Sequence, residues 1–430
     1  MEICPFVYGR ALQPKEFYNR SRELRRLLGR LITDQSTAVF GAPHIGKTSF
    51  LNYLLNDETR RSIVKDKLDR SIFSYIDSQI LEPGLDQPAF WKQVLSPLVH
   101  RFSTGTMYDT YKTAEDKQFK TFTLEHLFYE LGSQQWQFVL LIDEFDALLT
   151  HAILNSPEFY GSLRSFASRC PGFTLIIASR HSLDFLNQET QKISPHGSPY
   201  FNIFSELRLG PLPKGHAKAI IGRAGRHFDT QDREFILRVS GRHPYLLQVA
   251  ATILWELNNQ KRQDAQRYCE ASDELYSMTR SHFVDTWAAW SIGERKAITA
   301  IALAQINGMV DGHKFAWQTL IENIADYKAE LRCLKDAGII VEVSKDTWQI
   351  TQQAFLWWLA DEIRRIARDQ SSFEGWLCDQ EMDCLFTKKE RLLMGQAVKA
   401  ASGYIGSGAA SLIGTFLKRF GIPGIKAFGP

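Results

Sequence analysis

The 430-residue sequence lacks an excess of charge of either sign. Its 51 Lys and Arg residues against 48 Asp and Glu residues give a formal net charge of +3. Such a balance predicts no strong overall attraction to nucleic acid or to acidic membranes, although a local basic patch remains compatible with it. An apolar content of 44% and a charged content of 23% are ordinary for a globular protein that is long enough to form several domains.

Paired cysteines and an N-terminal export signal are also missing. The six cysteines show no Cys-x-x-Cys pair or other zinc spacing, and we interpret them as reduced thiols: Cys4, Cys170, Cys269, Cys333, Cys378 and Cys384. Residues 1–6 show no basic region followed by an apolar run. We therefore expect a cytoplasmic protein, with association with a membrane on activation left open.

Strand-like and helical patterns alternate through the first half of the chain. The expected helices are 14–31, 47–55, 87–102, 123–132 and 157–168, and the expected strands are 36–40, 71–77, 138–142, 173–178 and 207–209. Residues 104–120 are polar and unpatterned, and we expect a surface excursion there. Strands that alternate with helices predict an α/β fold with a parallel sheet covered on both faces.

The character of the chain changes after this region. We expect an α/β core over 1–213 and a helical lid over 214–285. Helices followed by a hairpin-like stretch predict a winged-helix domain over 286–370. A C-terminal helical and glycine-rich tail is expected over 371–430.

A phosphate-binding motif lies between an expected strand and an expected helix. The sequence fits G-x-x-x-x-G-K-[ST] with Gly41, Ala42, Pro43, His44, Ile45, Gly46, Lys47 and Thr48, and Ser49 follows. The glycines let backbone N–H groups surround a phosphate at the helix N-terminus. Lys47 is expected to reach the β- and γ-phosphates, and the Thr48 hydroxyl to bind Mg²⁺. The motif predicts a site for ATP or ADP.

A pair of acidic residues completes this site. Asp143 and Glu144 follow the five apolar residues 138–142, a pattern typical of a strand buried on both faces. We expect Asp143 to hold Mg²⁺ and Glu144 to polarise the attacking water. Asp146 is nearer to a helix start, and we interpret it first as a cap.

Arg180 follows the expected strand 173–178. Ligands of open parallel sheets bind outside the carboxyl ends of the strands, so a guanidinium there is placed to contact the γ-phosphate. The alternative is a surface salt bridge.

These motifs together resemble the STAND class of signalling ATPases, an AAA-like P-loop group that includes prokaryotic relatives of NLR-type immune receptors. The resemblance covers about residues 15–365, and its further elements are Phe17–Glu23, Ile176–Arg180 and Gly241–Leu247. It implies that Phe17, Tyr18, His243 and Pro244 lie near the adenine base. Ordinary core packing is the alternative for Phe17 and Tyr18.

The sequence departs from the family pattern at several points. Asn19 stands where the family usually has glycine, and Ser21 where it usually has glutamate. Residues 286–370 contain no Met-His-Asp-type motif, and no superhelical repeat follows. The adenine contacts and the mechanism of autoinhibition therefore do not transfer directly from the resemblance.

Two classes of function compete. The first is a slowly hydrolysing signalling switch, in prokaryotic stress or anti-phage defence, that forms a homo-oligomer and releases a C-terminal effector or adaptor on activation. The second is an origin-binding or transposition-type AAA ATPase whose winged helix grips DNA. Residues 286–370 contain ten basic and eleven acidic residues, a balance that disfavours DNA binding.

The tail favours the switch. No acidic residue follows Glu390, and Ala400–Leu417 carries no charge. Small residues recur there at every fourth position, as at close contacts between helices in lipid. The tail is thus a membrane-active or self-associating effector, a flexible or docked segment, or an adaptor for a separate effector protein.

Overall fold

The computed structural model describes residues 3–17, 20–195, 197, 199–260, 266–308, 313–366 and 370–404. Contacts within the chain divide it into two compact units, which we describe separately. The α/β unit comprises Ala11–Gly41 and Gly46–Leu209. The helical unit comprises Met1–Arg10, Ala42–Ile45 and Gly210–Pro430.

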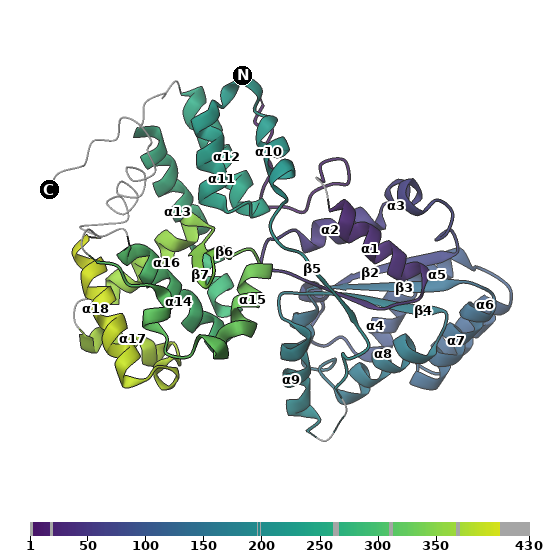
Figure 1. The fold of residues 1–430 in the computed structure, drawn as a ribbon. Coiled ribbons are helices and arrows are strands. Elements are labelled where there is room, and N and C mark those ends of the chain that lie inside the picture. Colours follow the sequence, from purple (N-terminus) through teal and green to yellow (C-terminus); the bar gives the residue numbers. More distant parts are fainter. Residues whose placement is uncertain are drawn as a thin grey trace. The chain divides into compact units, whose positions relative to one another are not determined.

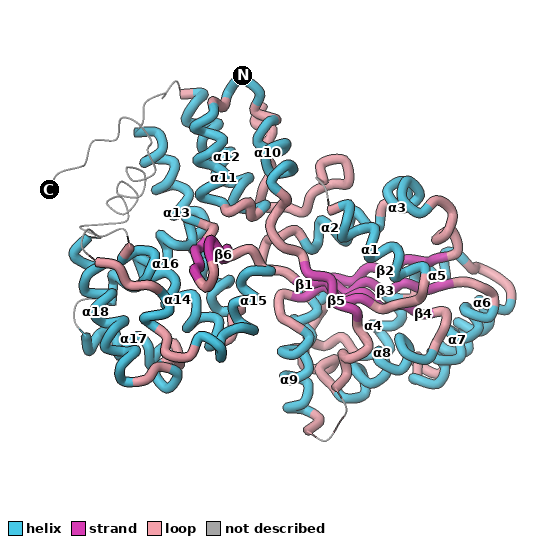
Figure 2. The backbone as a smooth tube through the Cα atoms, viewed as in Figure 1, coloured by secondary structure: helices cyan, strands magenta, loops and turns pink. Residues whose placement is uncertain are grey.

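The α/β unit contains a five-stranded sheet in the order β2-β3-β4-β1-β5 (Figure 2). All neighbouring strands pair in parallel. The strands are β1 (Thr37–Phe40), β2 (Ser71–Asp77), β3 (Gln137–Asp143), β4 (Phe173–Ser179) and β5 (Ser205–Arg208). The predicted α/β fold with a parallel sheet is confirmed.

Helices cover both faces of this sheet. The structure places α1, α2 and α3 on one side and α4, α7 and α8 on the other (Figure 1). The helices of the unit are α1 (Ser21–Ile32), α2 (Lys47–Leu55), α3 (Asp57–Val64), α4 (Gln87–Val94), α5 (Ser96–Arg101), α6 (Thr106–Asp116), α7 (Thr121–Ser133), α8 (Pro157–Arg169) and α9 (Leu183–Ile193). The 3₁₀ helices are η1 (Ser78–Ile80) and η2 (Phe145–Thr150). All residues of β1 and β4 are buried because both faces are covered.

The expectations for the first helix and for residues 104–120 are wrong. The first helix begins at Ser21 and not at Pro14, because Gln13–Phe17 forms a turn that a hydrogen bond from Glu16 N–H to Gln13 O closes at 2.9 Å. The segment 104–120 contains helix α6, not an irregular excursion. Its three buried residues, Met107, Tyr111 and Ala114, have helical spacing within an otherwise polar sequence.

The expected helix 87–102 is two helices. The first, α4, ends before Leu95, and Pro97 lies in the first turn of α5. A proline there lacks the N–H that a continuous helix would require.

The helical unit contains the second half of the chain. Its helices are α10 (Lys214–Gly222), α11 (Thr230–Ser240), α12 (Pro244–Asn259), α13 (Gln266–Ala288), α14 (Ile292–Asn307), α15 (Lys328–Asp336), α16 (Gln353–Ile366), α17 (Gln370–Asp379) and α18 (Lys388–Tyr404). Short 3₁₀ helices are η3 (Gly225–His227), η4 (Trp317–Leu320), η5 (Ile324–Tyr327) and η6 (Asp383–Leu385). An antiparallel hairpin joins β6 (Ile340–Ser344) and β7 (Thr347–Ile350). The expected hairpin is confirmed, whereas the boundaries of a lid and a winged-helix domain remain predictions.

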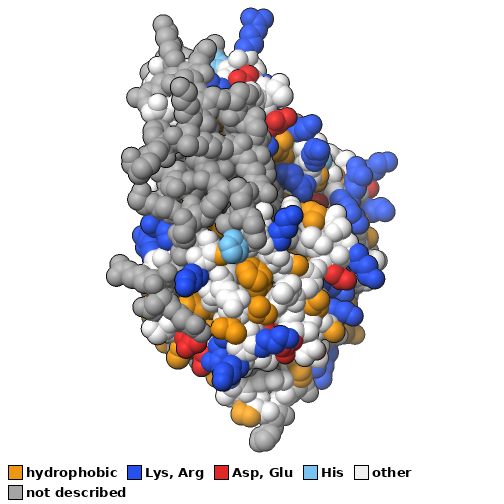
Figure 3. Space-filling model, turned by 60° about the vertical axis from the view of Figure 1, so that its left-hand side comes forward, with side chains coloured by type: hydrophobic (Ala, Val, Ile, Leu, Met, Phe, Trp, Pro, Cys, Tyr) orange, Lys and Arg blue, Asp and Glu red, His pale blue; other side chains and the backbone are white. Residues whose placement is uncertain are grey.

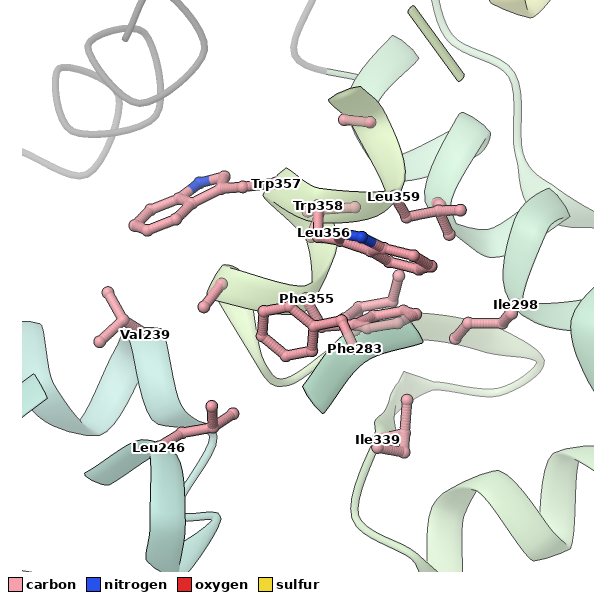
Figure 4. Close-up of a cluster of buried hydrophobic side chains, with 14 of the residues drawn as sticks. Val239, Leu246, Phe283, Ile298, Ile339, Phe355, Leu356, Trp357, Trp358 and Leu359 are labelled. Carbon is pink, nitrogen blue, oxygen red and sulfur yellow. The ribbon is translucent and has the colours of Figure 1, made fainter. Parts of the chain in front are cut away.

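Aromatic residues of α13 and α16 lie at the centre of this unit. Phe283, Phe355 and Trp358 pack with centroid distances of 5.5–6.2 Å, and Ile298 and Ile339 lie nearby (Figure 4). The tryptophans of α16, Trp357 and Trp358, are buried core residues.

A buried ion pair docks α18 on this core. Lys296 of α14 lies 3.7 Å from Glu390 of α18, and both side chains are only 3% exposed. Glu390 also accepts hydrogen bonds from Thr387 N–H at 2.8 Å and from Glu322 N–H at 2.9 Å. Met394, Ala397 and Val398 of α18 are buried in the same core. The segment that begins at residue 391 is therefore part of the packed helical unit as far as α18 extends.

The rest of the tail, residues 405–430, lies outside the described residues. The small-residue pattern from Gly406 onward, and with it most of the Ala400–Leu417 run, falls in this part. Over the part of the chain that the structure describes, no helix combines the length and hydrophobicity that a bilayer crossing requires.

The docking of α18 predicts different costs for two neighbouring lysines. Lys296→Met leaves Glu390 buried without its cation and should lower the free energy of unfolding of the helical unit by about 3–5 kcal/mol. Lys389→Met removes an exposed pair with Glu322 and should cost less than about 1 kcal/mol. Urea denaturation followed by tryptophan fluorescence measures the unfolding free energy of both variants, because all tryptophans from Trp255 to Trp376 lie in this unit. Equal, small effects of the two variants would show that the ion pair does not hold α18.

Candidate nucleotide-binding site

The phosphate loop connects β1 to α2 through a backbone that turns back on itself. Gly46 has φ +96° and His44 has φ +57°, both in the left-handed region. Such alternation points successive N–H groups into one concavity, which suits an anion. A Cβ placed on Gly46 would meet nothing within 4 Å, so the positive φ, and not a close contact, favours glycine at this position. The loop and the N-terminus of α2 therefore fit a phosphate group.

Lys47 is the first residue of α2 and is 5% exposed. Its Nζ donates a hydrogen bond to Gly41 O at 3.2 Å. Burial lowers the pKa of Lys47, and the carboxylates of Glu144, Asp146 and Asp143 oppose this shift. The loop thus holds a desolvated cation that acidic groups face.

The acidic pair lies at the carboxyl end of β3. Asp143 is 1% exposed, and its Oδ1 accepts a hydrogen bond from Glu144 N–H at 3.0 Å. Glu144 adopts φ +46°, a left-handed conformation that costs a non-glycine residue about 1–2 kcal/mol. Burial raises the pKa of Glu144, and Lys47 opposes this effect. The strained turn thus places two adjacent carboxylates at the end of one strand.

Arg180 forms an ion pair with Asp146. Its Nε donates to Asp146 Oδ2 at 2.5 Å, and its backbone N–H donates to Oδ1 at 3.3 Å. The Asp146 side chain is 3% exposed and that of Arg180 is 40% exposed. Burial would raise the pKa of Asp146, but the Arg180 guanidinium holds it below its usual value. The expectation that Asp146 caps a helix is wrong, because Glu144 occupies the N-cap of η2 and no side chain caps it.

The register of the sheet brings these residues to one edge. β4 lies between β1 and β3, with Phe40 opposite Ser179 and Ile142 opposite Ile177. The loop after β1, Arg180 after β4 and the acidic pair at the end of β3 therefore extend from three adjacent strands. Ligands of open α/β sheets bind at such an edge.

The oxygen groups at this edge suit magnesium. Thr48 is half-buried in the first turn of α2, and Asp143 supplies a carboxylate. Mg²⁺ prefers hard oxygen ligands and keeps several waters, so one hydroxyl and one carboxylate beside a phosphate are sufficient. The residues present therefore fit the expected metal.

The residues predicted near adenine fall into both units. In the α/β unit, the rings of Phe17 and Tyr53 of α2 pack in a tilted arrangement with a centroid distance of 4.7 Å, and Ser49 Oγ accepts a hydrogen bond from Leu12 N–H at 3.0 Å. These contacts hold the segment before α1 against the helix that begins at Lys47. Tyr18 lies outside the described residues.

The other two, His243 and Pro244, begin α12 in the helical unit. Gly241 precedes them with φ +55°, and a Cβ there would lie 2.6 Å from the Gln352 side chain. His243 is 1% exposed, and its ring lies 5.1 Å from that of His282. The structure thus buries His243 in the turn that the family resemblance identified.

The loop residues Ala42–Ile45 pack with the helical unit. The His44 ring stacks on Tyr245 at 4.9 Å and lies 5.4 Å from His282. Burial, together with the charge of His44, lowers the pKa of His282 to about 3. His282 is therefore neutral near pH 7.

Beside the acidic pair, sequence reasoning missed Tyr75 and assigned Asp146 the wrong role. Tyr75 of β2 donates a hydrogen bond to Asp143 Oδ2 at 3.0 Å, and Asp146 holds Arg180. The alternation of buried Ile72, Ser74 and Ile76 in β2 could have placed Tyr75 on the opposite face, but not beside Asp143.

The comparison with protein families is decisive for the class of protein. The family described as novel STAND NTPase 2 matches residues 30–307, which include the phosphate loop, the acidic pair and Arg180. The chain belongs to this family. The resemblance to STAND-class ATPases is thereby confirmed, and the protein is an ATPase. No curated protein matches the sequence significantly.

Among the solved structures that are similar to this STAND NTPase, one supports its fold. A Walker-type ATPase of Pyrococcus abyssi is 18% identical, and the match covers 83% of this chain and 99% of that chain with a TM-score of 0.52. A signal transduction ATPase with numerous domains and a tetratricopeptide repeat sensor, from Pyrococcus horikoshii, is 13% identical. That match covers 96% of this chain and 52% of the other, with a TM-score of 0.36. The first similarity supports the P-loop ATPase fold.

The site predicts the effect of removing its buried cation. Lys47→Ala should abolish ATP binding, because Lys47 is the side-chain cation that the loop directs toward the phosphates. Lys192→Ala, which removes an exposed lysine paired with Glu189, should leave binding unchanged. Titration with a fluorescent ATP analogue measures both variants, and thermal melts check their folding. Equal affinity of the wild type and a folded Lys47→Ala variant would refute the location of the site.

Proposed function

We propose that this STAND NTPase is an ATP-driven molecular switch that hydrolyses ATP slowly. Residues 41–49 bind the phosphates of ATP or ADP, and Thr48 and Asp143 hold Mg²⁺. The observation that carries the proposal is the convergence of Lys47, the acidic pair and Arg180 at one sheet edge. Bound Mg²⁺ would neutralise phosphate charge there.

In this proposal Glu144 positions the attacking water. Glu144 is the first residue after β3, and its carboxylate is close enough to Lys47 for the two charges to interact. The left-handed backbone at Glu144 supports a functional role, since strained residues concentrate at active sites. Phe17, Tyr18, His243 and Pro244 remain candidates for the adenine contacts.

Arg180 distinguishes ATP from ADP in the proposed switch. Moving a two-state equilibrium from 1:99 to 99:1 requires about 5.5 kcal/mol of differential binding. A charge-assisted arginine contact to the γ-phosphate supplies about 1.5–3 kcal/mol of this. The bond to Asp146 engages Nε, and an arginine has further N–H donors for a phosphate.

The output of the switch is proposed to pass through the C-terminal tail. Two observations support this: α18 is anchored on the helical core through Glu390, and no acidic residue follows Glu390. In the resting protein α18 would hold residues 405–430, which act after activation on a membrane or on a protein partner. Oligomerisation on activation and a role in stress or anti-phage defence complete the proposal.

The DNA-binding alternative has less support. The face in Figure 3 carries many Lys and Arg side chains, fewer Asp and Glu side chains and small hydrophobic areas, so the case against DNA rests on the charge balance of residues 286–370. The hairpin exposes Val341 and Val343, which are 43% and 50% exposed. Phosphate contacts would instead require clustered Lys or Arg.

The role of Arg180 predicts a selective loss of affinity. Arg180→Ala should lower the affinity for ATP about ten- to 150-fold more than the affinity for ADP, since only ATP has the γ-phosphate. The ratio of the two affinities is the readout, because the variant also leaves Asp146 without its partner. Arg61→Ala, an exposed arginine of the same unit, is the control. An equal loss for both nucleotides would assign Arg180 to the fold.

The switch itself is tested with Glu144→Gln. This variant should bind ATP with Mg²⁺ but hydrolyse it at least about tenfold more slowly, because it lacks the carboxylate that positions water. In the presence of ATP, the variant should therefore have the same particle size as the wild type bound to a non-hydrolysable ATP analogue. Its size should differ from that of the wild type bound to ADP. The same size with ADP and with the analogue would contradict a switch that works by oligomerisation.

Truncation separates the tail from the switch. Because α18 packs in the core, the truncation belongs after Tyr404 and not after Glu390. The shortened protein should keep nucleotide-dependent size changes and lose cellular toxicity or signalling. Dye release from anionic liposomes by the ATP-loaded protein supports membrane action, and retention of the dye together with capture of one soluble partner supports an adaptor. Unchanged signalling without the tail would refute its role as the output.

A further inference from the structure

Asp143 is held from two sides. Its Oδ1 accepts a hydrogen bond from Glu144 N–H, and its Oδ2 accepts one from the Tyr75 hydroxyl, both at 3.0 Å. The carboxylate is 1% exposed, so these bonds determine its orientation. The backbone bond is available to any residue at position 143 with an acceptor, whereas the second bond depends on Tyr75 alone.

The register of β2 and β3 explains this contact. Asp77 pairs with Asp143, and Tyr75 precedes Asp77 by two residues. Side chains two residues apart point to the same face of a sheet, so Tyr75 lies diagonally to Asp143 on that face. A tyrosine is long enough to span this diagonal.

Asp77, the acid that pairs with Asp143 in the register, does not compete for the hydrogen bond of the Tyr75 hydroxyl. Asp77 Oδ1 accepts a hydrogen bond from Gln79 N–H at 2.9 Å and caps η1. The Tyr75 hydroxyl therefore donates to Asp143 and not to Asp77.

We propose that Tyr75 is a positioning residue that orients the Asp143 carboxylate toward Mg²⁺ and thereby sets the affinity of the nucleotide complex for divalent cations. Outer hydrogen bonds to metal ligands commonly determine metal affinity in this way. The inference rests on the proposed roles of Asp143 and the phosphate loop. It adds a residue that the phosphate motif and the acidic pair do not contain.

The test is Tyr75→Phe, which removes only the hydroxyl. Titration of the protein and a fluorescent ATP analogue with Mg²⁺, and separately with Mn²⁺, gives the cation concentration for half-maximal binding. We expect this concentration to rise about tenfold. Binding of the analogue in EDTA should stay unchanged, because the proposed role of the Tyr75 hydroxyl is to orient Asp143, a ligand of the cation.

A matched control is Tyr160→Phe, which removes a buried hydroxyl that donates to Asn155 at 3.2 Å in the same unit. It should leave the cation titration unchanged. Asp143→Asn tests whether Tyr75 acts through Asp143: in the double variant, the loss of Tyr75 should add nothing to the loss of Asp143. If Tyr75→Phe proves unstable, the same titrations of Asp143→Asn and of Tyr75→Trp decide the question.

The outcomes separate this inference from the proposed function. An unchanged cation titration for Tyr75→Phe, or additive losses in the double variant, overturns the role of Tyr75 while the nucleotide site stands. Equal weakening with and without cation also overturns it. A wild-type protein that binds the analogue neither with Mg²⁺ nor in EDTA would overturn the nucleotide site itself.

Discussion

Three parallel strands end side by side at one edge of the α/β sheet, and the candidate site depends on this arrangement. β4 lies between β1 and β3, so the loop after β1, Arg180 after β4 and Asp143 at the end of β3 reach the same edge. Helices on both faces bury β1 and β4 completely and β3 from Phe138 onward, and a change of register would move each side chain to the opposite face. The hydrophobic core thus positions the polar chemistry.

Buried charge in this protein is compensated locally. Arg180 neutralises Asp146, Lys47 is surrounded by carboxylates, and Tyr75 hydrogen-bonds to Asp143. Lys296 and Glu390 show the same principle in the helical unit, where the pair anchors the last described helix. An ion removed from water is costly without such partners, so each pair also defines one arrangement of its elements.

The sequence predicted part of this structure correctly, for physical reasons. A parallel sheet follows from apolar strands that alternate with helices, and the phosphate loop follows from a spacing that backbone geometry requires. The helix α6 was missed because its three buried residues stand among polar ones, and helix periodicity is weak evidence in so short a segment. Asp146 was assigned to a cap because the sequence does not show that β4 brings Arg180 to it.

The sequence by itself determined the class of protein: the spacing of Gly41, Gly46, Lys47 and Thr48 is typical of a P-loop ATPase through local geometry alone. The acids after an apolar strand predict the metal site. Tertiary structure decided which distant groups complete that site. Tyr75 reaches Asp143 across 68 positions of sequence, and Glu390 reaches Lys296 across 94. Such contacts depend on strand register and helix packing, which are set by the whole core and not by neighbouring residues.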